Sequence, residues 1–273
     1  MQTHAPRRHE FTSVVPAMRR EFEVLDRYLG ALSAAHWLGP TYCSDWTVQK
    51  TVSHLGSGAD LHLRTLKENL DGAEPTTAEV RQSVWDYFDS LAPEPLYAQF
   101  QDRMEAFLGY LESMAPEARE RTVRFFAGEA PIAEYAQYRL SELSLHSWDI
   151  RVGLDPTARL LPTSARALWP HVLDNLNRRA NAKAKAELDG AVYELEVFTP
   201  ARQHVFLTVR DGAVAAQEEA AQPPLASLRL PAEAFIRLYS GRLPLEEAEA
   251  AGEVGISGDR AAALRLNSLF PGY

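Results

Sequence analysis

The chain has 273 residues, of which 46% are hydrophobic and 24% charged, a globular composition at a length that favours two domains. Its net charge of -9 argues against a nucleic-acid partner, because phosphate binding requires a basic surface. The single cysteine, Cys43, excludes an intrachain disulfide framework, and no stretch resembles a signal peptide or the roughly 18 apolar residues of a membrane span. We therefore expect a cytoplasmic protein with neither a membrane nor a nucleic acid as partner.

Hydrophobic periodicity predicts helices through the first part of the chain. Over residues 14–34, apolar side chains recur at steps of three and four, which is typical of one face of an amphipathic helix. Further helices, bounded by glycine, proline and capping residues, are predicted over 47–70, 77–91, 95–114 and 132–152. Residues 121–132 indicate an irregular link or a short extended piece. Residues 1–155 are therefore predicted to form a helical bundle of four main helices with minor ones.

After residue 155 the pattern changes to a mixture of strands and helices. Short apolar runs, several of them alternating with polar residues, predict strands over 191–198, 204–209, 225–231 and 253–259. Helices are predicted over 163–187, 231–241 and 260–270. Because strands and helices do not alternate strictly, residues 156–273 are predicted to form an α+β domain with a largely antiparallel sheet.

Glu142 and His146 are the residues whose types and spacing point most directly to chemistry. Four positions apart on a predicted helix, they project from one face and could bind one tetrahedral ion together. A carboxylate and an imidazole suit Zn²⁺, with Mn²⁺, Ni²⁺ and Fe²⁺ as competitors. The best third ligand is His54 on the helix 47–70, where Gly58 one turn away would keep bulk out of the site. The alternative is that these are ordinary structural residues, because an ExxxH pair also occurs on helices by chance.

Neighbouring residues are candidates for supporting roles. Asp149 could orient a ligand histidine, and Arg139 or Arg151 could bind a substrate carboxylate, so we predict Asp149 and Arg139 as catalytic residues. Cys43 is most simply a small buried residue at a helix start, although a helix N-terminus can activate a thiol. The sequence contains no phosphate loop, dinucleotide fingerprint, serine-hydrolase elbow or HExxH zinc helix.

Two segments carry a resemblance to a known family. The segment WLGPTYCSDWTVQKTVSHL at 37–55, and RLSELSLHSWDIRVGLD at 139–155, are similar to the two signatures of mycothiol-dependent maleylpyruvate isomerase-like proteins, a branch of the DinB-like metalloenzymes. The stretch F.RL.SGR at 235–242 resembles the small sterol-carrier-like domain of the same family. The resemblance thus extends over nearly the whole chain.

The resemblance implies a DinB-like four-helix bundle over 1–155, followed by a sterol-carrier-like α+β domain over 156–273. It implies one divalent metal, with zinc favoured, on His54, Glu142 and His146. It also implies mycothiol as a low-molecular-weight thiol cosubstrate, which would bind at the open metal position as the thiolate. The corresponding activity is an isomerase or an S-transferase for a small electrophilic or unsaturated carboxylate.

Several points stay open at this level. Arg237 and Arg242 are candidates for binding an anionic group of the thiol or the substrate, with a plain surface role as the alternative. The metal could instead serve a thiol-independent hydrolase, lyase or isomerase, or the fold could be a non-catalytic sensor of a small ligand. We expect a small-molecule substrate and either a monomer or a homodimer.

Overall fold

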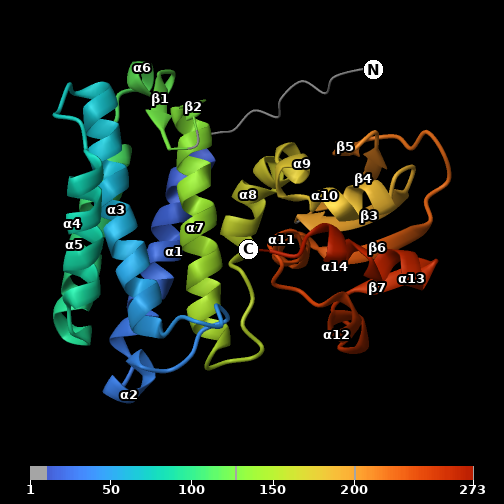
Figure 1. The fold of residues 1–273 in the computed structure, drawn as a ribbon, viewed down its shortest axis with the longest axis horizontal. Coiled ribbons are helices and arrows are strands. Elements are labelled where there is room, and N and C mark those ends of the chain that lie inside the picture. The colour runs from blue at the N-terminus through green and yellow to red at the C-terminus, as the bar shows by residue number, and fades with distance from the viewer. Residues whose placement is uncertain (1–10, 127, 200, 273) are drawn as a thin grey trace. The chain divides into compact units, whose positions relative to one another are not determined.

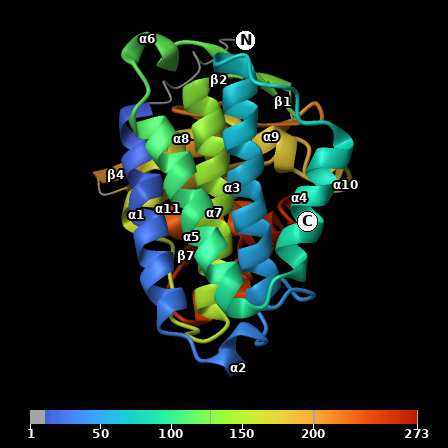
Figure 2. The same cartoon turned by 90° about the vertical axis from the view of Figure 1, so that its left-hand side faces the viewer.

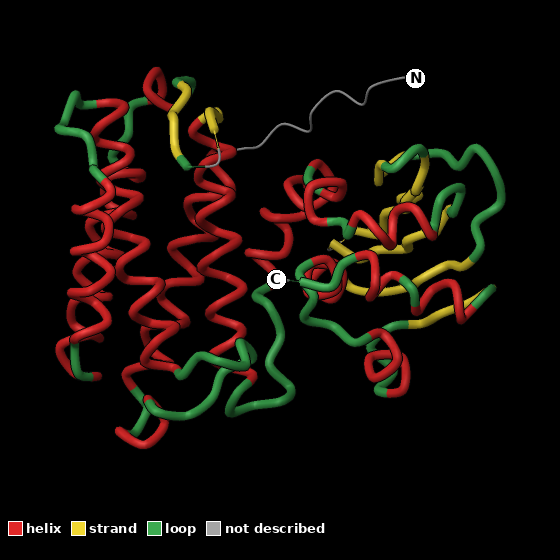
Figure 3. The backbone as a smooth tube through the Cα atoms, viewed as in Figure 1, coloured by secondary structure: helices red, strands yellow, loops and turns green. Residues whose placement is uncertain are grey.

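The structure is a computed structural model that describes residues 11–126, 128–199 and 201–272. It divides into two compact units, one within residues 9–160 and the other within residues 161–273. The first unit is helical and the second contains a sheet with helices (Figures 1 and 3). This is the two-domain α+β fold that the sequence predicts.

Long helices run side by side in the N-terminal unit (Figures 1 and 2). They are α1 (Phe11–Gly30), α3 (Val48–Leu70), α4 (Ala78–Ser90), α5 (Pro93–Glu112) and α7 (Ile132–Val152), joined by the short α2 (Ala34–Trp37) and α6 (Pro116–Arg119). The apolar stripe predicted for the first helix is buried, including Val15, Met18 and Phe22. Helix α1 packs against α7, and α3 packs against α5 and α4. Helices α3 and α7, which carry the candidate ligands, therefore lie within one packed core.

A small antiparallel hairpin lies between α6 and α7. Its strands are β1 (Thr122–Phe125) and β2 (Gly128–Pro131), in the segment where the sequence indicates an irregular link or a short extended piece. Val123 pairs with Ala130, and both side chains are buried. The hairpin packs against α3 and α7, so its aromatic side chains lie near the helices of the candidate site.

The loop before α3 is attached to the end of α7. The Tyr42 N–H donates to the backbone oxygen of Asp149, and the Thr41 N–H donates to that of Trp46. A Cβ at Gly153 would lie 2.5 Å from the Pro40 carbonyl oxygen, so only glycine permits this close approach. The Thr47 side chain then accepts a hydrogen bond from the Lys50 N–H and caps α3. These contacts hold the loop over the C-terminal turns of α7.

The C-terminal unit is built on a five-stranded sheet of order β5-β4-β3-β6-β7. Only β3 and β6 pair in parallel, and the other three pairs are antiparallel, as expected from the sequence. Leu195 lies between Val205 and Leu228 in the register, and all three are buried. The strands are β3 (Val192–Thr199), β4 (Ala201–Arg210), β5 (Ala213–Gln217), β6 (Ala226–Pro231) and β7 (Gly255–Gly258). The helices are α8 (Pro162–Asp174), α9 (Leu176–Arg179), α10 (Ala182–Glu187), α11 (Ala232–Tyr239), α12 (Leu245–Ala250), α13 (Arg260–Leu264) and α14 (Leu266–Leu269).

The single helix predicted over 163–187 is wrong, because the chain forms α8, α9 and α10 there. The Asn175 side chain donates to the carbonyl oxygen of His171 and ends α8, and Asn181 then caps α10 by accepting from the Ala184 N–H. Residues 260–270 likewise form two short helices in place of one. Among the described residues, no helix is long and apolar enough to cross a membrane.

Candidate metal centre

The structure brings His54 of α3 together with Glu142 and His146 of α7. The Nε2 atom of His54 lies 3.4 Å from Oε2 of Glu142, and Nε2 of His146 lies 3.7 Å from the same oxygen. One ligand atom from each of the three residues lies within 4.8 Å of the other two. The sequence therefore identified three side chains that meet in space. Their role as metal ligands stays a prediction.

The donor set and its spacing fit a divalent ion. Two ligand atoms each about 2.1 Å from a tetrahedral ion lie about 3.4 Å from each other, close to the separations seen here. A direct N–H···O hydrogen bond would bring the same atoms to about 2.9 Å. Two imidazole nitrogens and one carboxylate oxygen are also the ligand types of catalytic zinc sites, which leave a fourth position open. These residues could therefore hold such an ion.

The charge states of these groups suit ligation as well. Burial alone would raise the pKa of Glu142, but His54, His146 and Arg139 outweigh it and lower that pKa to about 2. Burial lowers the pKa of His54, with Glu142 opposing the shift. Near neutral pH the carboxylate is thus ionised and the His54 imidazole is neutral, which are the forms that bind metals.

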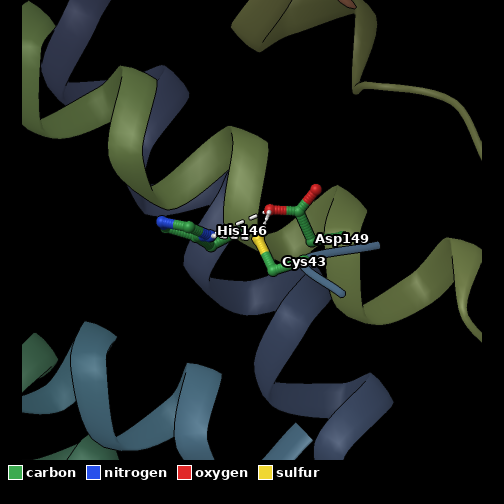
Figure 4. Close-up of side chains that lie close together, drawn as sticks. All are labelled: Cys43, His146 and Asp149. Carbon is green, nitrogen blue, oxygen red and sulfur yellow. Dashed lines mark hydrogen bonds and ion pairs between the residues drawn. The ribbon is translucent and has the colours of Figure 1, made fainter. Parts of the chain in front are cut away.

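Asp149 holds the other side of the His146 ring. Its side chain is fully buried, and its Oδ2 lies 2.9 Å from Nδ1 of His146 and 3.3 Å from Sγ of Cys43. Figure 4 shows the ring nitrogen and the thiol directed at this one carboxylate oxygen. When Nδ1 carries the proton and donates it to Asp149, Nε2 is left to face Glu142. This contact is the one expected for Asp149 as the residue that orients His146.

Cys43 is a member of this cluster that the sequence interpretation missed. Its Sγ lies 4.0 Å from Nδ1 of His146, and with Asp149 these atoms form a second group close enough to share an ion. We interpret the group as a hydrogen-bonded one, because Nδ1 of His146 and the Asp149 oxygen are already at hydrogen-bond distance. The sequence feature that could have identified Cys43 is its position in the same segment, 37–55, as the candidate ligand His54.

Trp46 covers the two imidazoles. Its ring centroid lies 5.5 Å from that of His146 in a stacked arrangement, and 5.1 Å from that of His54. The two histidine rings meet edge to face, with centroids 4.9 Å apart. The Trp46 side chain is only partly buried, so it forms part of the surface around these rings.

A pocket of about 600 Å³ opens beside His54 and Glu142. It is lined by residues of α3, α4, the β1–β2 hairpin and α7, including Trp85, Phe125, Phe126 and Tyr138. His62, the histidine nearest to His54 in the sequence, also lines it and has Nδ1 2.6 Å from the Tyr135 hydroxyl. The aromatic wall was not foreseen, because much of it comes from the hairpin.

Arg139 lies in the wall of this pocket and is only 1% exposed. Its Nη2 donates to the Leu55 carbonyl oxygen at 2.7 Å. A Cβ at Gly58 would lie 2.9 Å from Nη1 of Arg139, so Gly58 leaves room for the guanidinium. Arg151, the alternative considered for a substrate carboxylate, instead donates to the Arg159 carbonyl oxygen and lies 3.7 Å from a Glu21 oxygen.

Comparisons with known proteins assign both units. Residues 18–151 match the mycothiol maleylpyruvate isomerase N-terminal domain, and residues 171–271 match the SCP-2 sterol transfer family. The chain belongs to the mycothiol-dependent maleylpyruvate isomerase-like family. No curated protein matches the chain.

Two solved structures of a mycothiol-dependent maleylpyruvate isomerase have the same two-domain fold as this member of the family. The first has a TM-score of 0.62 at 16% identity, and the match covers 91% of this chain and 93% of that one. A histidine-to-alanine variant of the isomerase matches with a TM-score of 0.61 and the same identity and coverage. At this identity the likeness concerns the fold alone.

The SCP-2 unit contains the two arginines that were candidates for binding an anion. Arg237 is 4% exposed and forms ion pairs with Glu233 and Glu253 within its own domain. Nη1 of Arg242 donates to the Ser240 carbonyl oxygen. The charge of Arg237 is thus balanced by two carboxylates, which argues against a free anion site there, and the binding role of both residues stays a prediction.

Proposed function

We propose that the protein is a metal-dependent isomerase that uses a low-molecular-weight thiol, with mycothiol as the first candidate, on a small unsaturated carboxylate. The observation that carries the proposal is the N₂O donor set of His54, Glu142 and His146, with Asp149 behind His146. Family membership supports the thiol and the reaction class, because the family is named for a mycothiol-dependent isomerase. A divalent ion held there would lower the pKa of a coordinated thiol and so supply a thiolate.

The reaction needs no net transfer of atoms. The thiolate sulfur adds to one carbon of a cis double bond, so that a C–S bond forms and the π electrons move toward the conjugated carbonyl. The remaining single bond rotates, and elimination of the thiolate restores the double bond as the trans isomer. An S-transferase would begin with the same attack by sulfur but would keep the C–S bond.

The chain's own residues have separate tasks in this scheme. The Asp149 carboxylate holds His146 in one tautomer and one ring orientation. Trp46 restricts water at the imidazoles. Arg139, whose charged group lines the adjoining pocket, would bind the substrate carboxylate and share the negative charge that develops during the addition.

Metal analysis tests the first half of the proposal. We expect about one divalent ion per chain in the purified protein and none in His146→Ala. The matched control is His204→Ala, which removes a half-exposed histidine of the C-terminal unit and should leave the metal content unchanged. Wild-type protein that folds normally but binds no divalent ion would overturn the proposal.

Mass spectrometry tests the second half. The metal-loaded protein is incubated with mycothiol and a set of cis-unsaturated carboxylates that begins with maleylpyruvate, and products are separated by chromatography. Thiol-dependent formation of an isomer with unchanged mass supports the isomerase. A product heavier by one thiol identifies an S-transferase. A product formed without thiol identifies a thiol-independent enzyme, an isomerase if the mass is unchanged and a hydrolase or lyase if it changes. Binding of a ligand without turnover of any substrate would support the sensor alternative.

A further inference from the structure

The pocket beside the candidate metal centre has one aromatic wall, formed by Trp85, Phe125, Phe126 and Tyr138. Phe126 lies with its ring centroid 5.4 Å from that of Tyr138, and Phe125 lies 5.9 Å from the same ring. Trp85 of α4 completes the lining, and Phe126 and Trp85 are 76% and 42% exposed. A volume of about 600 Å³ is in the range of pockets that enclose ligands much larger than a four-carbon diacid. The wall therefore favours a substrate with a sizeable apolar body.

One positive charge in this pocket lacks a carboxylate partner. Among the residues that the structure describes, Arg139 forms no ion pair, and its Nε has no hydrogen-bond partner. Buried guanidinium groups are usually paired, because desolvating an unpaired charge is costly. Glu142 is the acidic neighbour that influences Arg139 electrostatically, but as a metal ligand its charge would be shared with the ion. Arg139 thus retains the capacity to bind an anion.

The other two arginines of the lining, Arg81 and Arg124, are exposed to solvent, unlike Arg139. Arg124 is paired with Glu129, and Arg81 donates to the Thr76 carbonyl oxygen. Glu68 accepts hydrogen bonds from the backbone N–H and the hydroxyl of Thr76. Arg139 is therefore the buried positive charge of this pocket without an ion-pair partner among the described residues, which favours one anionic group on the ligand over two.

Arg139 lies close to the candidate metal ligands along both helices. Arg139 precedes Glu142 by three residues on α7, and Gly58, which adjoins its guanidinium, follows His54 by four residues on α3. Both spacings correspond to about one helical turn, or roughly 5 Å along the helix axis. A carboxylate bound at Arg139 would place a conjugated double bond on the side of the pocket that holds His54 and Glu142.

We propose that this pocket binds a monocarboxylate with an aromatic or similarly bulky apolar body, with the carboxylate at Arg139 and the body against Phe125, Phe126, Tyr138 and Trp85. The orientation of the double bond rests on the proposed function, whereas the binding itself does not. The substrate class is then an aryl- or alkyl-substituted 2-enoate, and a compact dicarboxylate would use the pocket poorly.

Calorimetric binding to the full-length, metal-loaded protein without thiol tests this proposal. The probes are cinnamate, cinnamyl alcohol with the same body but no charge, and maleate with charge but no apolar body. Cinnamate should bind about tenfold or more tightly than either of the others, because a hydrogen bond to a charged group contributes about 1.5–3 kcal/mol. Equal affinity for cinnamate and cinnamyl alcohol, or tighter binding of maleate, would overturn it.

Amino-acid substitutions distinguish the contribution of Arg139 to binding from that of the aromatic wall. Arg139→Gln should weaken cinnamate about 10- to 100-fold and leave cinnamyl alcohol unchanged. Gly58→Ala should act in the same direction, because its methyl group displaces the guanidinium, and it provides a second test if Arg139→Gln does not fold. Trp85→Ala should weaken both ligands several-fold. Tyr87→Ala, which removes a similarly exposed aromatic of α4 outside the pocket, should weaken neither.

The outcomes also distinguish this proposal from the proposed function. Cinnamate binding that depends on Arg139, without thiol-dependent turnover of any acid, would support the pocket and count against the isomerase. Thiol-dependent isomerisation of compact diacids, without cinnamate binding, would support the isomerase and overturn the pocket assignment. If mycothiol alone displaces cinnamate competitively, the pocket belongs to the thiol, and the proposal is wrong.

Discussion

Each of the two units buries an arginine, and the two differ in what balances the charge. Arg237 of the C-terminal unit is 4% exposed and contacts two carboxylates of the same domain. Arg139 of the N-terminal unit is 1% exposed and has one hydrogen bond to a backbone oxygen. Removing one member of a buried ion pair destabilises a fold because it leaves the other charge unpaired, whereas a buried charge without an ion-pair partner is a candidate for binding a ligand. The two arginines are thus equally buried but differ in their carboxylate partners, which agrees with the binding role proposed for Arg139.

The largest expected effect concerns the paired arginine. Arg237→Met should lower the free energy of unfolding by about 3–5 kcal/mol, because Glu233 and Glu253 would be left buried without their cation. Urea unfolding followed by circular dichroism measures this change. Arg265→Met, which removes a half-exposed partner of Glu187, is the control and should cost less than about 1 kcal/mol. A similarly small loss in Arg237→Met would remove the contrast between the two arginines.

The next effect concerns the carboxylate behind His146. Asp149→Asn should weaken metal binding about 10- to 100-fold, because the neutral amide orients the imidazole less firmly and lowers its basicity. Competition with a chromophoric chelator measures the affinity. Cys43→Ala should have a clearly smaller effect, since it leaves the contact between His146 and Asp149 in place. Equal effects of both substitutions would mean that the thiol is itself a ligand.

The stability of the N-terminal unit should depend on pH through one histidine, His62. Burial lowers the pKa of His62 to about 3, with Arg139 and His54 adding to the shift. Between pH 6.5 and 3 the unfolded chain therefore binds a proton at His62 that the folded chain does not, so stability falls as the pH falls. From this residue we expect a loss of about 1–2 kcal/mol between pH 6.5 and 5. Urea unfolding at both pH values should show a smaller loss in His62→Gln, and an unchanged pH dependence would contradict this expectation.

The smallest expected effect on stability is at Arg139, the arginine proposed to bind the substrate carboxylate. Arg139→Met should change the free energy of unfolding by about 1 kcal/mol or less, since it removes one hydrogen bond and relieves a buried charge. The same urea measurement compares it directly with Arg237→Met. A loss as large as that of Arg237→Met would show that Arg139 stabilises the bundle and would weaken its assignment to a carboxylate.

Local patterns were sufficient for most of the fold. The spacing of Val15, Met18 and Phe22 predicted the buried face of α1, and the alternation around Leu195 predicted a strand. The division of 163–187 into three helices was not predicted, because it depends on side-chain hydrogen bonds of Asn175 and Asn181 that compete with an otherwise helical pattern.

The candidate site was predictable in part for similar reasons. Helical spacing places Glu142 and His146 on one face, whereas His54 was only the best candidate among the histidines until the resemblance to a family supported it. The proximity of Cys43 to Asp149 depends on the attachment of the loop to α7, which no local pattern reports. Neither ion pair of Arg237 was predicted: Glu233 lies at i, i+4 spacing on the same helix, and the contact with Glu253 arises only in the folded domain.

The stacking of Trp46 on His146 has an optical consequence. An indole within 5.5 Å of two candidate ligands would transfer excitation to an ion with d–d absorption, such as Co²⁺ or Cu²⁺, and its emission would be quenched. Zn²⁺ has a filled d shell and would leave the emission nearly unchanged. The emission of Trp46 would thus distinguish bound Co²⁺ or Cu²⁺ from Zn²⁺, and because the chain has five tryptophans, Trp46→Phe should remove only the metal-dependent part of the quenching.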